Sequence, residues 1–166
     1  MLKKTFYAIV FSTISMASYS FASEFNSQLE HVRTQVKTVL RSWQKAEMTV
    51  RQAKKMAPEL YDTLETTAEQ IVALESVNAK MIDVADQQYN TIVDANAAYK
   101  PVDFLTVYFP EKKKTMKPYL YLLCSAMANR KYRLLLWRKL VKKEKELETE
   151  VGSEENIDTF LDKIAK

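Results

Sequence analysis

Residues 60–99 read LYDTLETTAEQIVALESVNAKMIDVADQQYNTIVDANAAY and contain neither glycine nor proline. Most of the apolar side chains in this stretch recur at alternating spacings of three and four residues, which is typical of one face of a long helix. About forty helical residues make a rod about 60 Å long. Such a rod must bury its apolar face, so the stretch predicts an all-α fold. The predicted face consists of Leu60, Leu64, Thr67, Ile71, Leu74, Asn78, Met81, Ala85, Gln88, Ile92, Ala95 and Tyr99.

The stretch before it carries the same pattern. Apolar side chains from Leu29 to Ala57 follow a heptad-like spacing and predict a first helix over residues 26–56. Pro58 favours the start of a second helix over 58–99, because proline fits the first turn but not a helix interior. Either a hairpin or a kink could join the two helices. We favour the hairpin, since a kinked rod would expose two long apolar faces.

Beyond Pro101, a long connection over residues 100–117 precedes a third predicted helix over 118–150. The apolar face of this helix is wide enough to contact two neighbours. Gly152 predicts its end and Ser153 the cap of a short fourth helix over 154–165. We therefore expect an elongated, coiled-coil-like antiparallel bundle of three helices with a short C-terminal fourth helix. Thr67, Asn78 and Gln88 are expected to fix the register of its core.

Composition and charge support this interpretation. The 166 residues include one glycine and four prolines, too few for the many turns of a sheet protein. Residues 59–99 carry eight acidic and one basic side chain, whereas residues 100–147 carry thirteen basic and four acidic ones. An acidic middle helix between basic neighbours suits an antiparallel bundle.

The N-terminus has the pattern of an export signal. Lys3 and Lys4 precede an uncharged apolar stretch, and small residues at Ser20 and Ala22 suit cleavage. We expect residues 1–22 to be removed after Ala22, leaving a single helical domain over 23–166 in the bacterial periplasm or outside the cell. An uncleaved membrane anchor is the alternative, although the stretch barely reaches spanning length. Lipidation would need a cysteine at the new N-terminus, and the chain has only Cys124.

The connection is the first candidate site. It is longer than most loops between bundle helices and contains a run of apolar side chains. These either cover the end of the bundle or form an exposed recognition surface. The predicted partner-binding residues are Phe104, Tyr108, Phe109, Lys112, Lys113 and Lys114.

A second candidate is a basic stripe at helical spacing, made by Lys131, Arg138, Lys142 and Lys145. It could contact an anionic membrane surface, although a solvated helix face has the same pattern. Removal of Lys3 and Lys4 with the leader lowers the formal net charge from +4 to +2, which argues against nucleic acid as a partner.

Signatures of catalysis and cofactor binding are not found. The single histidine, His31, and the single cysteine, Cys124, cannot form a zinc site or an internal disulfide, and no phosphate-binding loop or nucleophile motif occurs. A haem or metal carrier with His and Met ligands is a further alternative. The sequence favours an exported protein of the cell envelope that acts by protein contact, as an adaptor, a chaperone-like factor or a subunit accessory to secretion or pili. Self-association is left open.

Overall fold

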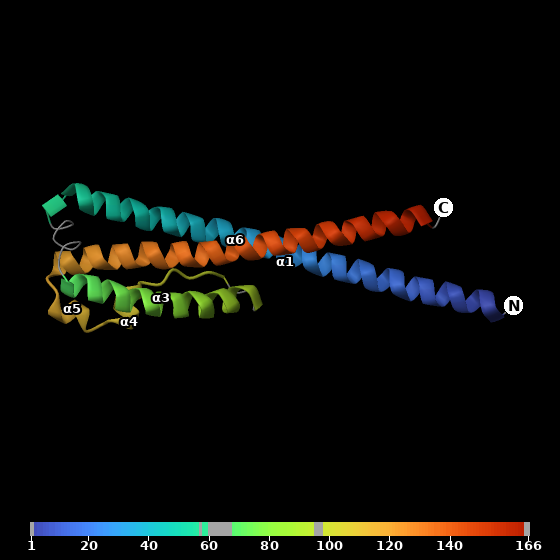
Figure 1. Cartoon of the computed structure of the whole chain (residues 1–166), viewed down its shortest axis with the longest axis horizontal. Coiled ribbons are helices and arrows are strands. Elements are labelled where there is room, and N and C mark those ends of the chain that lie inside the picture. The colour runs from blue at the N-terminus through green and yellow to red at the C-terminus, as the bar shows by residue number, and fades with distance from the viewer. Residues whose placement is uncertain (1, 57, 60–67, 95–97, 165–166) are drawn as a thin grey trace. The chain divides into compact units, whose positions relative to one another are not determined.

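The computed structural model describes the backbone of residues 2–56, 58–59, 68–94 and 98–164, and the side chains of 23–56, 58–59, 74–94, 98–118 and 120–153. Its elements are α1 (Leu2–Met56), α3 (Ala68–Asp94), α4 (Phe104–Tyr108), α5 (Lys112–Thr115) and α6 (Pro118–Ile164), shown in Figure 1. Over these residues all regular structure is helical, which confirms the prediction of an all-α chain. The side chains of the predicted leader, residues 1–22, lie outside the described set.

The chain forms two compact units. One joins residues 1–33 to 142–166, and the other comprises residues 34–141. In the first unit, Leu29 and Val32 of α1 and Leu147 of α6 are buried. The predicted apolar spacing of α1 is also observed in the second unit, where Val39, Ala46 and Val50 are buried.

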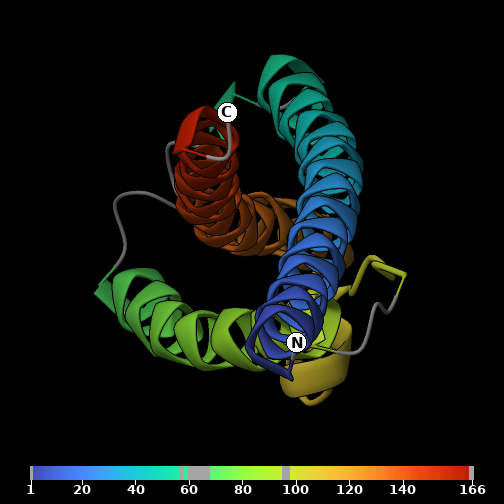
Figure 2. The ribbon, with the colours of Figure 1, turned by 90° about the vertical axis from the view of Figure 1, so that its right-hand side faces the viewer.

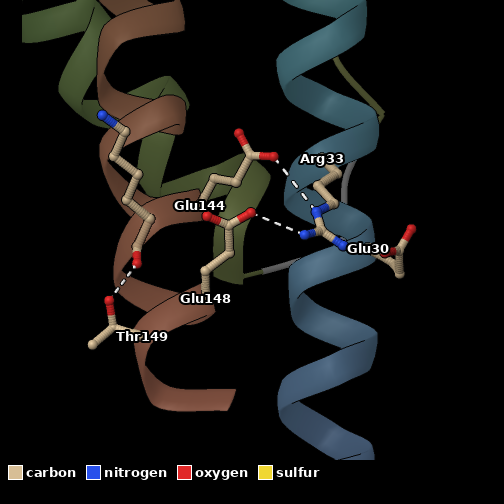
Figure 3. Close-up of polar contacts among 6 residues, drawn as sticks. Glu30, Arg33, Glu144, Glu148 and Thr149 are labelled. Atoms are coloured by element: carbon tan, nitrogen blue, oxygen red, sulfur yellow. Dashed lines mark hydrogen bonds and ion pairs between the residues drawn. The ribbon is translucent and has the colours of Figure 1, made fainter. Parts of the chain in front are cut away.

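Ion pairs accompany the buried side chains of the first unit. The guanidinium of Arg33 lies 2.8 Å from Glu30 on its own helix and 2.9 Å from Glu148 on α6. A third carboxylate, that of Glu144, lies 3.6 Å from the Arg33 Nε, and Figure 3 shows all three around the guanidinium. Hydrogen bonds from Arg33 to Glu148 and Glu30 raise its pKa. One cation thus joins two helices through three carboxylates.

Three helices surround the core of the second unit. Figure 2 shows the first part of α6, in orange, between the green α3 and the teal end of α1. Arg130 of α6 pairs with Glu47 of α1 at 3.2 Å, and Lys139 of α6 pairs with Asp86 of α3. The predicted third helix therefore contacts two neighbours. The largest fully buried side chains of this core are Tyr132, Phe104, Met81, Ile92, Leu136 and Leu140.

The helix directions correct the predicted bundle. The chain reverses between α1 and α3, but α3 and the first part of α6 run the same way, so strict alternation is wrong for this pair (Figure 1). The physical reason is the length of the connection. Residues 98–103 are not helical and can reach about 20 Å when extended, about half of the roughly 40 Å length of α3, and α4 and α5 follow them before α6 begins.

The predicted break at Gly152 is also wrong, because α6 continues through it to Ile164 and no separate fourth helix forms. One glycine inside a helix costs only about 1 kcal/mol and need not end it. Ser153 does not cap a new helix. Its hydroxyl instead donates a 2.8 Å hydrogen bond to the carbonyl of Thr149, one turn back on the same helix.

The buried face of α3 is wider than predicted. Met81, Ala85 and Ile92 are buried as expected, and Val77 and Val84 are buried beside them. Asn78 and Gln88 are only half-buried, so they lie at the edge of the core, and Thr67 lies outside the described residues. The predicted helix end at Tyr99 is also too late, because α3 ends at Asp94 and Tyr99 is buried in a non-helical stretch.

Candidate interaction surface

Residues 98–117, here called the return segment, link α3 to α6 and contain α4 and α5. Most of its apolar side chains point into the core: Phe104 is 0% exposed and Phe109 is 7% exposed. The ring of Phe104 lies 4.8 Å from that of Tyr108 and 5.9 Å from that of Tyr132 on α6, measured between ring centres. Such tilted ring pairs add to the energy of apolar burial. The segment is therefore packed as part of the bundle.

Asp103 holds the start of α4 against α6. Its carboxylate accepts a 2.7 Å hydrogen bond from the Ser125 hydroxyl and a 2.8 Å bond from the Thr106 hydroxyl. Partial burial opposes ionisation of Asp103, but the hydrogen bonds from Ser125, Thr106 and Asn129 together lower its pKa. The charged form of this carboxylate is thus the one that the structure favours.

Two further hydrogen bonds tie the same turn to α6. The Asn129 side-chain oxygen accepts a 2.9 Å bond from the backbone N–H of Phe104. The hydroxyls of Thr106 and Tyr121 lie 2.8 Å apart, and because Thr106 donates its single proton to Asp103, Tyr121 must be the donor here.

The α6 partners of this turn follow a simple spacing. Tyr121, Ser125 and Asn129 are four residues apart, so they form one polar line on the helix. Sequence reasoning missed this line and the anchoring role of Asp103. The signal was present, because three polar residues at i, i+4 and i+8 interrupt an otherwise apolar stretch and require buried or half-buried partners.

The exposed side of the return segment is small and basic. Val107 of α4 is 56% exposed, and the lysines of α5 follow it, with Lys112 half-buried and Lys113 and Lys114 exposed. Lys80 of α3 joins them, because its ammonium group lies 4.3 Å above the centre of the Phe109 ring. Phe109 in turn accepts a 3.0 Å backbone hydrogen bond from the N–H of Lys112.

The structure divides the predicted partner-binding residues into two groups. Phe104 and Phe109 lie in the core, which agrees with the alternative that the apolar run covers the end of the bundle. Tyr108 is half-buried, whereas Lys113 and Lys114 remain accessible. The apolar run contributes side chains both to the core and to the surface. Within α4, Phe104 and Leu105 are buried, whereas Val107 is exposed.

The predicted basic stripe on α6 is less uniform than its spacing suggests. In the second unit Lys131 is half-buried and Arg138 is exposed. In the first unit Lys145 is exposed, and the ammonium of Lys142 lies 3.8 Å from Glu146, one turn along the helix. An exposed pair of this kind contributes little stability but offsets part of the positive charge.

The remaining candidates are the single cysteine, a metal site and a membrane-spanning helix. Burial raises the pKa of the Cys124 thiol, and the charge of Lys112 opposes this, so the thiol is the favoured form. Among the described side chains, no group of three or more His, Cys, Asp or Glu residues is placed to hold a metal ion. The same residues include no helix with the length and apolar character needed to cross a bilayer.

No protein-family model, curated protein or solved structure shows a significant match to this chain.

Proposed function

We propose that this chain is exported and acts in the cell envelope by binding another protein through the exposed side of its return segment. In this proposal residues 1–22 direct export and are removed. The helical bundle then serves as a support that holds α4 and α5 in a fixed position. The chain contributes recognition, and no reaction step is assigned to it.

The proposal rests on the hydrogen bonds that hold the return segment against α6. A loop that only joined two helices would not need Asp103, Thr106 and the Phe104 N–H all bonded to one line of α6 side chains. Ordering a loop before binding reduces the entropy that is lost when a partner binds. Val107 and the α5 lysines are thus presented by a segment that already has a defined shape.

Binding to a membrane surface is the alternative, and the burial pattern does not favour it. Interfacial helices insert aromatic and large aliphatic side chains between lipids. In α4 those side chains are Phe104 and Leu105, and both are buried in the protein core. Tyr108 is half-buried, so α4 offers mainly Val107 for insertion, and the exposed Leu122 lies on α6.

Site-specific cross-linking tests the proposal directly. A photoreactive phenylalanine analogue replaces Val107, which is 56% exposed, and a matched variant carries it at Met48 of α1, which is 61% exposed. We expect illumination of living cells to give one discrete cross-linked protein from position 107 and none from position 48. Equal patterns from both positions, or no product from position 107, would contradict a partner site on the return segment.

A further inference from the structure

Four lysines gather on the return segment and the helix beside it. Lys112, Lys113 and Lys114 make up most of α5, and the Lys80 ammonium is held over the Phe109 ring that precedes them. We call Lys80, Lys112, Lys113 and Lys114 the cationic patch. Lys80 comes from α3, so the fold adds a fourth lysine to the run formed by Lys112, Lys113 and Lys114.

The patch carries unbalanced charge. Within the described residues, none of its four ammonium groups forms a salt bridge with a carboxylate, whereas Arg33, Arg130 and Lys139 all do. On α3, Asp83 lies three residues from Lys80, but no ion pair between them is observed, and acids are few within the return segment itself. Asp103 is occupied by its hydrogen bonds to Ser125 and Thr106, and Glu111 is the only other acid between residues 98 and 117.

Like charges held close together repel one another and raise the free energy of the free protein. An acidic ligand relieves this repulsion and is attracted over a distance of about 8 to 10 Å at ordinary salt concentrations. The contact between Lys80 and Phe109 adds to the effect, because it fixes one cation against the surface and so reduces the entropy lost on pairing.

Resting on the function proposed above, we propose that the cationic patch binds an acidic stretch of the partner polypeptide, with several Asp or Glu side chains, beside an apolar contact at Val107. The α5 lysines suit this task because each is a mobile point charge that can follow irregularly spaced carboxylates. The α4 side chains that a bilayer would need are buried, which favours a polypeptide over an anionic membrane.

The test uses the full mature chain with poly-L-glutamate as the acidic probe, measured by fluorescence anisotropy at low and high salt. The patch variant carries Lys80→Glu, Lys113→Glu and Lys114→Glu. The control variant carries Lys37→Glu, Lys45→Glu and Lys55→Glu, three exposed lysines of α1, and changes the net charge equally. We expect the patch variant to bind at least about tenfold more weakly and the control variant to bind nearly as well as the original.

Equal weakening in both variants would mean that binding follows net charge alone, and would overturn the patch. If the triple patch variant loses helicity by circular dichroism, the double variant Lys113→Glu with Lys114→Glu replaces it, because no described side-chain contact involves either residue. Vesicles of phosphatidylglycerol and phosphatidylcholine form a second arm. Stronger binding to vesicles than to poly-L-glutamate, lost in the patch variant, would overturn the choice of a polypeptide.

The cross-link at position 107 separates this inference from the proposed function. If the cross-linked partner persists at full yield in the patch variant, the proposed function stands and the inference about acidic recognition fails. If no partner is cross-linked from the original chain, the proposed function fails. Loss of the cross-link in the patch variant, with its retention in the control variant, is the result that we expect.

Discussion

The hydroxyl of Ser125 on α6 donates a 2.7 Å hydrogen bond to the carboxylate of Asp103, which begins the turn leading into α4. Replacing Ser125 by Ala should lower the free energy of unfolding by about 1 kcal/mol, because a bond to a charged acceptor is lost where water can partly replace it. Urea denaturation measures the change. Ser27→Ala, at an exposed position of α1, is the control and should change stability by less than about 0.5 kcal/mol.

Protonation of Asp103 at low pH should weaken the hydrogen bonds that hold the start of α4 against α6. The folded structure lowers the pKa of this carboxylate below its ordinary value of 3.8, so its contribution is complete above that value and is lost as the pH falls through the folded pKa. Unfolding free energies of the original chain and of Asp103→Asn should therefore converge between about pH 5 and about pH 2. A constant difference across this range would show that Asp103 contributes nothing through its charge.

Phe104 should contribute far more to stability than its neighbour on the exposed side of α4. Because its ring is fully buried, Phe104→Ala should destabilise the chain by about 3 to 5 kcal/mol. Val107→Ala, three residues later and 56% exposed, should change the unfolding free energy by at most about 0.5 kcal/mol. Thermal unfolding monitored by circular dichroism distinguishes the two variants.

Gly152 tests the continuity of α6. A methyl group added at this position would meet nothing within 4 Å, so Gly152→Ala should stabilise the chain by about 0.5 to 1 kcal/mol through the higher helix propensity of alanine. If the helix ended here with glycine in a left-handed conformation, the same substitution would destabilise the chain. The sign of the change in melting temperature therefore decides between the two structures.

Export should be visible in the mass of the protein. We expect intact-mass spectrometry of the protein from the periplasm or the medium to show a chain that begins at Ser23. Ala22→Arg places a large charged residue at the cleavage position and should leave the precursor unprocessed. A precursor mass in the original chain under the same conditions would contradict the assignment of residues 1–22 as a cleaved leader.

Sequence periodicity predicted the long helices well, because burial of one face imposes the same spacing wherever a helix packs. Met81, Ala85 and Ile92 were each expected in an apolar face and are buried. Helix ends were harder, since they depend on local energies of about 1 kcal/mol that tertiary contacts override. Gly152 is the clearest example.

The candidate surface was predictable only in part. Lys113 and Lys114 stand in a charged run and are exposed, as such runs usually are. Lys80 could not be assigned to the same surface, because its place depends on the direction of α3 relative to the return segment. The burial of Phe104 likewise depends on α6 residues that come 25 or more positions later.

The hydrogen bonds that hold α4 join residues that are close together in the sequence. Asp103 to Ser125, Phe104 to Asn129 and Thr106 to Tyr121 span 22, 25 and 15 residues, whereas the pairs that join α6 to α1 through Glu47 and Ser42 span 83 and 91. Closing the smaller loops costs less chain entropy. We therefore expect the contacts between the return segment and the start of α6 to form before those between α6 and α1.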